Sequence, residues 1–363
     1  MKIIYIITGL GMGGAEQQVC NLADNLISRG HSVKIVYLLN PIIVKPKSKE
    51  VSIMWLGGNR SLFSIFFSFL NLVKIIIKEK PDVIHSHMFH ANILSRLAKF
   101  FSFGFLLVNT AHNTNEGGKL RMLAYRITDP LADIFTNVSL EAVEAFEKKK
   151  AAPMGRMFFV HNGINTNYFK FNANIRHHIR NLYNLEGKTV FIAIGRFHEQ
   201  KDYPNLIDAF CQLKKNQPNI HLLIVGDGIL RTNIEKMIIE RKLSESITLL
   251  GLRQDIPDLL SAADIFVLSS AWEGFGLVVA EAMACERVVI ATDCGGVSEV
   301  LGNTGFLVSP KNSNALSIGM EKALQLSTDK RKILGEKARL RVMQLYGLDA
   351  ATDKWLSIYS KQR

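Results

Sequence analysis

Short apolar segments alternate with helix-length segments along nearly the whole chain, and this pattern limits the possible folds more than any other feature of the sequence. The apolar segments form two series separated by a polar stretch. The first series comprises residues 3–7, 33–38, 83–85, 106–109, 134–137 and 157–160, and the second comprises residues 189–194, 221–225, 247–250, 265–268 and 288–291. Such alternation is typical of parallel strands joined by crossover helices. We therefore predict an α/β protein with two parallel sheets.

The polar stretch between the two series marks the predicted domain boundary. Residues 162–188 are rich in asparagine and lack apolar periodicity, as linkers often do. A chain of 363 residues is also too long for one average hydrophobic core. We predict a first domain over residues 1–165, a second over residues 166–345 and a terminal helical segment over residues 346–363.

The composition is that of a folded globular protein. Apolar residues make up 48% of the chain and charged residues 21%, which excludes a disordered protein. The four cysteines form no Cys-x-x-Cys pair and do not cluster with histidines, so we expect a reduced compartment and no structural zinc. Residues 1–8 form only a strand-length apolar run, and we expect no secretory signal there.

Positive charge is concentrated in the first half of the chain. The formal net charge is +12, and residues 1–165 hold 19 lysines and arginines against 11 acidic residues, or +8. This excess indicates an anionic partner such as phospholipid, pyrophosphate or nucleic acid. Nucleic acid has the least support, because the chain has no zinc-finger spacing, no RNA-recognition signature and no arginine-rich arm.

One aromatic segment, residues 61–77, resembles a membrane segment at first sight. It is too short to span a bilayer, which takes about 20 apolar residues, and Asn71 and Lys74 interrupt it. We favour a crossover helix packed on the sheet over a helix in a membrane interface. Residues 100–108 continue the aromatic richness, so membrane contact stays open as an alternative.

Two glutamates separated by seven residues form the main candidate ligand site. Glu273 and Glu281 follow an apolar strand, and Gly274 and Gly276 allow a tight turn before a helix that is predicted to begin near Leu277. The first turn of a helix leaves unpaired N–H groups where an anion can bind, and each carboxylate can accept hydrogen bonds from a pair of hydroxyls. This pattern suits a sugar nucleotide. The alternative is that one glutamate caps the helix and the other is solvated.

The loop of residues 9–14 matches the Gly-x-Gly-x-x-Gly pattern of dinucleotide sites. Such a site also needs an acidic residue after the second strand, but that strand ends in Leu38-Leu39-Asn40, so a nicotinamide enzyme is disfavoured. We interpret the loop as backbone that faces a phosphate or a sugar. Its glycines can also serve only the packing of strand and helix.

Two cations follow the first strand of the second domain. Arg196 and Lys201 lie in the loop beyond that strand, at the edge of the sheet where ligands bind in such folds. Fixed cations there would stabilise a departing diphosphate, although two solvated surface charges are the simpler alternative. The chain has no Asp-x-Asp pair to hold a divalent ion, so we expect a metal-independent reaction.

With these motifs in this order, the chain resembles the retaining glycosyltransferase family GT4, whose signature is two glutamates flanking seven residues. The resemblance implies the GT-B fold, in which two Rossmann-like, doubly wound domains face each other across a cleft. The other motifs that carry it are Gly13-Gly14-Ala15-Glu16, Arg29-Gly30-His31, Asn162-Gly163-Ile164, Gly195-Arg196 with Lys201, Gly226-Asp227-Gly228 and Gly295-Gly296-Val297-Ser298-Glu299.

The resemblance also implies roles for individual residues. His112 would hydrogen-bond the donor sugar, and a buried structural histidine is the competing interpretation. Glu299 would lie near the ribose or the base, or cap the helix that follows it. The last helix would return to the first domain through Trp355 and Tyr359, spaced i and i+4. The catalytic set is His112, Glu273, Arg196 and Lys201, and the donor-binding set is Gly13, Gly14, Arg196, Lys201, Glu273, Gly274, Phe275, Gly276, Leu277 and Glu281, with no metal ligand.

The sequence departs from the family pattern in two places. Cys285-Glu286-Arg287-Val288 lacks the glycine and the proline that usually follow the signature helix, and His161 stands where proline is common. Neither place belongs to the proposed donor contacts. We therefore expect changes in local stability and not in activity.

Together these features predict a retaining, metal-independent hexosyl- or N-acetylhexosaminyltransferase. We expect a UDP-sugar donor, a lipid-linked or polysaccharide acceptor from bacterial O-antigen, lipopolysaccharide or capsule synthesis, and a cytoplasmic protein held peripherally on the inner face of the plasma membrane. A nucleotide-sugar 2-epimerase of the same fold is one alternative. A catalytically silent sugar-nucleotide-binding protein is the other.

Overall fold

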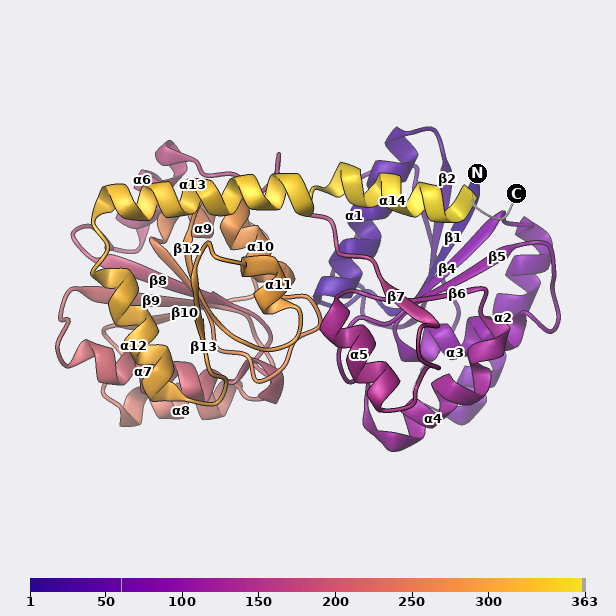
Figure 1. Cartoon of the computed structure of the whole chain (residues 1–363), viewed down its shortest axis with the longest axis horizontal. Coiled ribbons are helices and arrows are strands. Elements are labelled where there is room, and N and C mark those ends of the chain that lie inside the picture. Colours follow the sequence, from indigo (N-terminus) through magenta and orange to yellow (C-terminus); the bar gives the residue numbers. More distant parts are fainter. Residues whose placement is uncertain (60, 361–363) are drawn as a thin grey trace. The chain divides into compact units, whose positions relative to one another are not determined.

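The computed structural model describes residues 1–59 and 61–360, which form two compact units. Unit 1 comprises Met1–Gly163 together with the chain from Leu348 onward, and unit 2 comprises Ile164–Gly347. A single parallel sheet lies at the centre of each unit, with helices on its faces (Figure 1). The prediction of two parallel-sheet α/β domains is confirmed.

The sheet of unit 1 has seven strands in the order β3-β2-β1-β4-β5-β6-β7. Their bounds are β1 Lys2–Gly9, β2 Ser32–Leu39, β3 Ser52–Trp55, β4 Val83–His87, β5 Leu106–Thr110, β6 Ile134–Asn137 and β7 Met157–Phe159. All neighbours are parallel. The chain runs outward from β1 to β3 and then continues on the other side with β4, so the switch point lies between β1 and β4. Ligands of such sheets bind beyond the carboxyl ends of the strands at this point.

Helices cover both faces of this sheet (Figure 1). They are α1 Gly14–Ser28, α2 Leu62–Glu79, α3 Phe89–Ala98, α4 Gly118–Thr128, α5 Leu140–Lys148 and α14 Leu348–Ser360. The core on one face includes side chains of α1 and α14, among them Trp355 and Tyr359, whereas the core on the other face includes α2 and α3. The last helix of the chain is thus part of unit 1.

The sheet of unit 2 has six parallel strands in the order β10-β9-β8-β11-β12-β13. Their bounds are β8 Thr189–Ile194, β9 Ile220–Val225, β10 Ile247–Gly251, β11 Ile265–Leu268, β12 Val288–Thr292 and β13 Phe306–Val308. The helices are α6 Ala173–Leu182, α7 Tyr203–Lys214, α8 Arg231–Glu240, α9 Ile256–Ala262, α10 Leu277–Ala284, α11 Val297–Leu301, α12 Ser313–Leu324 and α13 Thr328–Leu345. Here the switch point lies between β8 and β11, so the loops after these two strands are expected to form the ligand site.

The structure differs from the sequence-based expectation at the sheet edges and in the polar stretch. The short edge strands β3 and β13 were not predicted, because they are only four and three residues long and only partly buried. The stretch 162–188 contains α6, which packs against α9. Arg176 and Arg180 of α6 both pair with Asp264 just before β11, so this polar segment is attached to unit 2 by charges.

Helix α2 packs on the sheet and also exposes aromatic side chains. Leu72 and Ile76 are fully buried in the core, whereas Phe63, Phe66 and Phe67 are more than half exposed. Within the described part of the chain, no helix has the length and apolar character needed to cross a membrane. The predicted crossover helix is present, and its outer face is unusually apolar.

The departures after α10 have local structural consequences. Glu286 adopts a left-handed conformation, with φ of 62°, where glycine would be unstrained. Arg287, between the positions of the missing glycine and the missing proline, is buried and donates hydrogen bonds to the carbonyl oxygens of Cys285 and Ala263 at 2.8 and 2.6 Å. Its guanidinium also lies 4.6 Å from the ring centre of Phe171. The arginine therefore stabilises this turn through its side-chain contacts, while the glutamate carries backbone strain.

Candidate active site

A buried ion pair joins the loops that follow the two central strands of unit 2. The Nζ atom of Lys201, after β8, donates to Oε1 of Glu273, after β11, at 2.6 Å. Side-chain exposure is only 15% for the lysine and 9% for the glutamate. The structure thus brings two predicted site residues into direct contact at the switch point of the sheet.

Two residues that the sequence did not single out complete the hydrogen bonding of Glu273. The Ser270 hydroxyl donates to Oε1 at 2.7 Å, and Gln200 Nε2 lies 3.4 Å from Oε2. Ser270 is fully buried, and its own carbonyl accepts a hydrogen bond from Thr292. Their positions in the sequence could have identified them, because Ser270 comes just after a buried strand and Gln200 directly precedes Lys201. These contacts fix the carboxylate before any ligand binds.

Two glycines allow the close packing of this ion pair. The Lys201 side chain crosses directly over Gly195, where a Cβ atom would lie 2.9 Å from Cε of the lysine. Gly295 has φ of 59°, and a Cβ atom there would lie 2.1 Å from the carbonyl oxygen of Glu273. Both distances are below van der Waals contact, so any larger residue would displace the loops that carry the ion pair.

Arg196 occupies the same loop as Lys201 but has a different environment. Its side chain is exposed and, within residues 1–59 and 61–360, makes no hydrogen bond or ion pair. An exposed guanidinium can bind a phosphate through two N–H groups at once. Arg196 is therefore available for an anion, whereas Lys201 already has a carboxylate partner.

Helix α10 begins at Leu277, as predicted, and Gly276 precedes it in a left-handed conformation with φ of 81°. The Phe275 side chain is 3% exposed and packs edge-on against Tyr346, with the ring centres 5.4 Å apart. Phe275 and Leu277 are both buried, so the predicted ligand contacts of this turn would come from backbone N–H groups. Such groups are unpaired in the first turn of a helix and attract oxygen ligands.

Glu281 lies one turn before the end of α10 and is 9% exposed. Burial raises the pKa of its carboxyl from about 4.5 to about 8, although nearby Lys201 lowers it. Without a ligand, Glu281 is therefore mainly protonated at neutral pH. The Glu273 carboxylate, by contrast, has a lysine, a serine and a glutamine beside it.

His112 lies in unit 1, two residues beyond β5. Its Nε2 atom is 3.0 Å from Nδ1 of His87, the last residue of β4, and burial lowers the pKa of His112 to about 4. Its backbone N–H donates to Glu116, whose other carboxylate oxygen accepts a hydrogen bond from Tyr125. Neither His87 nor Glu116 was predicted, because their proximity to His112 depends on the pairing of β4 with β5 and on the turn after β5.

Gly13 and Gly14 lie where β1 leads into α1, with Gly13 as the residue before the helix. A Cβ atom on Gly13 would lie 2.6 Å from Oε2 of Glu16, so the buried Glu16 carboxylate lies against this loop. A carboxylate in the first turn disfavours a second anion there and favours a hydroxyl donor. The loop is thus better suited to a sugar than to a phosphate.

The predicted residues form two sets, and each is described within its own unit. Unit 1 holds Gly13, Gly14 and His112, and unit 2 holds Arg196, Lys201, Glu273, Gly274, Phe275, Gly276, Leu277 and Glu281. Glu299 lies in the first turn of α11, and its carbonyl accepts hydrogen bonds from Arg341 and Tyr346. Among the described residues, no group of three or more His, Cys, Asp or Glu side chains could hold a metal ion.

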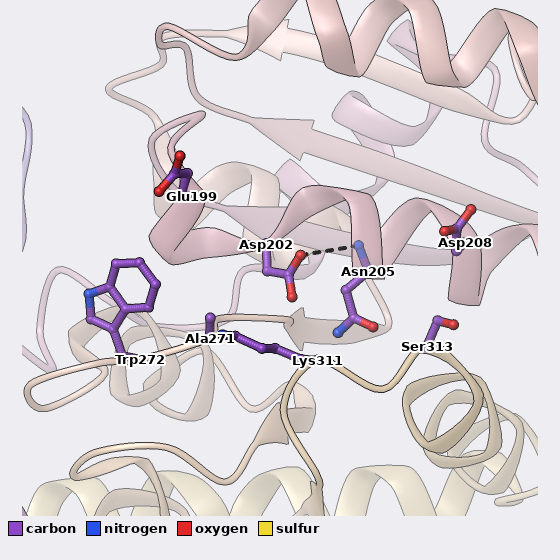
Figure 2. A pocket seen from close by; sticks show the side chains of 8 residues that line it. All are labelled: Glu199, Asp202, Asn205, Asp208, Ala271, Trp272, Lys311 and Ser313. Atoms are coloured by element: carbon purple, nitrogen blue, oxygen red, sulfur yellow. Dashed lines mark hydrogen bonds between the residues drawn. The ribbon is translucent and has the colours of Figure 1, made fainter.

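A separate pocket of about 510 Å³ lies in unit 2 near the start of α7 (Figure 2). It is lined by Glu199, Asp202, Asn205, Asp208, Ala271, Trp272, Lys311 and Ser313. None of the predicted site residues lines it. The side chain of Asp202 caps α7 by accepting a hydrogen bond from the Asn205 backbone, and burial raises the pKa of this carboxyl.

Comparison with known proteins assigns both halves of the chain to glycosyltransferase families. Residues 12–168 match the family described as Glycosyltransferase Family 4, and residues 175–341 match the family described as Glycosyl transferases group 1. The two matched regions correspond to most of unit 1 and unit 2. The resemblance inferred from the motifs is confirmed.

Two related proteins illustrate the range of the similarity. Alpha-D-kanosaminyltransferase of Streptomyces kanamyceticus is 29% identical over 188 residues, which cover 51% of this chain and about half, 48%, of that protein. UDP-Gal:alpha-D-GlcNAc-diphosphoundecaprenol alpha-1,3-galactosyltransferase of Escherichia coli is 26% identical over 315 residues, which cover 83% of this chain and 81% of that protein.

Solved structures extend the likeness to the whole fold. HepE of Anabaena, crystallised in complex with UDP-glucose, superposes with a TM-score of 0.87 and 20% identity, covering 99% of this chain and 100% of that one. This likeness concerns the architecture of the two sheets and their helices. The chain therefore belongs to the glycosyltransferases of family 4 and group 1 and has the GT-B fold.

Proposed function

We propose that this protein is a retaining, metal-independent glycosyltransferase that moves a sugar from a UDP-sugar to a lipid-linked glycan acceptor in surface-polysaccharide synthesis. The observation that carries the proposal is the Lys201–Glu273 pair beside the exposed Arg196. This arrangement offers a carboxylate for sugar hydroxyls and cations for a diphosphate within one pair of loops. Glu281, one turn into α10, would accept hydrogen bonds from hydroxyls of the nucleoside.

The chemical step breaks the bond between the anomeric carbon and the diphosphate oxygen and forms a bond from that carbon to an acceptor hydroxyl. Negative charge grows on the departing diphosphate, and Arg196 and Lys201 would stabilise it in place of a metal ion. The acceptor proton would pass to the departing phosphate oxygen. The reaction would then be complete without any protein group that gains or loses a proton.

Retention of configuration requires either a carboxylate nucleophile or attack on the face from which the diphosphate leaves. Glu116 is the carboxylate nearest in sequence to His112, and both of its oxygens accept hydrogen bonds, from the His112 backbone and from Tyr125. A carboxylate held in this way is a poor nucleophile. This supports attack of the acceptor on the face from which the diphosphate leaves. In an epimerase, which releases a sugar without an acceptor, the loops of the site would have to act differently.

The proposed lipid-linked acceptor follows from a relative and from the surface of unit 1. The galactosyltransferase of Escherichia coli acts, by its name, on a diphosphoundecaprenol-linked sugar. In this chain the outer stripe of α2 carries Phe63, Phe66, Phe67 and Leu70, and the turn after α3 adds Phe100, Phe101 and Phe103, all exposed. We call these seven residues the aromatic patch. Its two parts are joined by Phe69 and Phe101, whose ring centres lie 5.7 Å apart.

Positive charge follows the aromatic patch along the same stripe of α2. Lys74 and Lys78 are exposed one and two turns beyond Leu70, while Glu79, the only acidic residue of α2, is paired with Lys2 and Lys34. Apolar rings followed by exposed lysines fit an anionic lipid surface. The basic run Lys148-Lys149-Lys150 is separate, because it ends α5, which packs against β6 and β7.

Ligand screening tests the proposed donor. The protein is heated with a panel of nucleotide sugars, and a ligand at a hundred times its Kd should stabilise it by about 2.7 kcal/mol. The donor found in this way is then offered with a polyprenyl-diphosphate glycan, and we expect a glycosylated lipid with the donor's anomeric configuration. Release of an epimerised sugar without acceptor would establish the epimerase instead. Stabilisation without any turnover would favour a silent binding protein.

Co-sedimentation with vesicles tests the proposed membrane contact. Wild type should bind more as the fraction of anionic lipid rises, and salt should release it, because each lysine contributes about 1 kcal/mol that salt screens. A Phe63→Ser/Phe67→Ser variant should lose binding at all salt concentrations. A Lys148→Glu/Lys149→Glu/Lys150→Glu variant should weaken only the part of the binding that depends on salt, and the exposed Lys74 and Lys78 should retain the rest of that part. Equal binding of all three proteins would rule out both surfaces.

A further inference from the structure

Three histidines, of which His85 and His87 are buried, form a row beside the proposed donor-sugar contact of unit 1. His85 and His87 end β4, and their ring centres lie 4.0 Å apart. The His87 ring lies 5.2 Å from that of His112, with the hydrogen bond of 3.0 Å between Nδ1 of His87 and Nε2 of His112. His85 is held at both ring nitrogens, by Tyr359 of α14 at 2.6 Å and by Thr110 of β5 at 2.7 Å. His87 therefore links His85, which is held at both ring nitrogens, to His112.

All three rings are neutral in this environment. Burial lowers the pKa values of His85 and His87 well below the usual range, and it lowers that of His112 to about 4. Two neutral imidazoles can share a hydrogen bond only if one nitrogen carries the proton and the other presents its lone pair. The bond between His87 and His112 therefore couples the tautomers of the two rings.

Of the two possible tautomer arrangements of His87 and His112, one leaves a less costly unpaired atom in the protein. His87 Nε2 is buried and has no hydrogen-bond partner among the described residues. If His87 donates from Nδ1, its Nε2 atom is an unpaired acceptor. If His87 accepts at Nδ1, its Nε2 atom carries the proton and is an unpaired buried N–H group. Orphaned buried donors are rarer in proteins than orphaned acceptors, because each donor has a single hydrogen to satisfy.

We propose that His87 is a positioning residue that donates from Nδ1 to Nε2 of His112 and so holds the His112 proton on Nδ1. His112 is only partly buried, and its Nδ1 makes no hydrogen bond within the described residues, so its N–H group is available to a ligand oxygen. Such a donor would bind a hydroxyl oxygen of the donor sugar, and in this respect the inference rests on the proposed function. The tautomer itself does not depend on that function.

The backbone next to His87 shows that its position is tightly constrained. Met88 follows it with φ of 72° and ψ of 161°, a strained conformation for a residue with a side chain. Its N–H group donates to the carbonyl of Thr110 in the neighbouring strand. Strain of this kind persists where surrounding contacts impose it, and here it occurs at the end of the strand that presents His87.

Nitrogen NMR of protein labelled only at histidine tests the tautomer directly. Signals of His112 are identified by their absence from His112→Gln, and His90→Gln serves as the matched control. We expect wild-type His112 to carry its proton on Nδ1. In His87→Leu the proton should move to Nε2, which free neutral histidine prefers, whereas in His87→Asn the carboxamide N–H can replace Nδ1 of His87 and keep the wild-type pattern.

Kinetics with the donor identified by screening gives the second readout. His87→Leu should lose about tenfold in kcat/KM, the effect of one lost hydrogen bond, and His87→Asn should recover most of it. A wild-type proton on Nε2 overturns the inference, even if His87→Leu fails to fold. If the NMR result is as expected but no sugar is transferred, the positioning role stands and the proposed function fails. Unchanged spectra in a folded His87→Leu protein would also refute the role of His87.

Discussion

Replacing Glu281 by glutamine should make the unliganded protein more stable, by an amount that grows with pH. The folded-state pKa of Glu281 is raised from about 4.5 to about 8, so the folded protein holds a proton that the unfolded chain releases. For a group with a raised pKa, the favourable contribution is fully present below pH 4.5 and is lost as the pH rises towards 8. Glutamine has nearly the same shape and carries no charge, so it avoids this loss.

The size of the stability difference follows from the distance between the pH and the pKa of the unfolded chain. Each pH unit between the two pKa values changes the free energy of unfolding by about 1.4 kcal/mol, so the difference at pH 7 should approach roughly 3 kcal/mol. Unit 2 has the size at which 1 kcal/mol shifts Tm by about 2–4 °C, which gives an expected shift of about 6–12 °C. The two proteins should melt together near pH 4.5 and differ increasingly up to pH 8.

Calorimetric melts of wild type and Glu281→Gln between pH 4.5 and 8 check this reasoning. Glu240→Gln, at an exposed position on α8, controls for the loss of a carboxylate in general and should leave the pH profile unchanged. The same variant should bind the donor roughly 10–100-fold more weakly, because it removes the carboxylate that we propose accepts two hydroxyls. Parallel pH profiles of wild type and Glu281→Gln would refute the raised pKa and the argument built on it.

Four further outcomes are expected. Arg196→Ala should lower kcat/KM by roughly 10–100-fold without a change in Tm, and EDTA should leave wild-type transfer unaffected; loss of activity in EDTA with recovery in manganese would contradict a metal-independent step. Lys201→Ala should lose activity and also about 3 kcal/mol of stability in denaturant unfolding, because it leaves Glu273 buried without a counter-charge. Glu116→Gln should keep activity within about tenfold and the same product anomer by NMR, whereas complete loss of turnover would indicate a carboxylate nucleophile. Glu286→Gly should raise the free energy of unfolding by about 1 kcal/mol, because it relieves a left-handed conformation; a lower Tm would mean that the contact with Arg339 outweighs the strain.

Most of the strands that could be predicted from the sequence are central strands with buried residues. Strands such as β8 and β11 are almost entirely apolar, so they appear as short apolar runs, and their predicted bounds agree with the structure. The edge strands β3 and β13 are only four and three residues long and are partly exposed, so they give a weaker signal. Their place is determined by pairing with β2 and β12, which is information that the local sequence does not contain.

The same limit applies to the candidate site. Loops after parallel strands can be located from the sequence, and this brought Lys201, Glu273 and Glu281 into one site. In unit 1, which side chains touch depends on strand order: β4 pairs with β5, and so His87 reaches His112. A carboxyl group's protonation also depends on burial, which periodicity predicts only coarsely. Hydrogen-bond partners and pKa shifts therefore had to come from the structure.

The ion pair of Lys201 with Glu273 changes how the two cations should be interpreted. From the sequence, Arg196 and Lys201 were equivalent candidates for binding a diphosphate. In the structure the lysine neutralises a buried carboxylate, so its removal would affect folding, sugar binding and phosphate binding at once. Arg196 makes no competing contact in the described part of the chain, and its loss should affect only a bound anion. The arginine is thus the residue whose replacement can isolate the contribution of charge to the departure of the diphosphate.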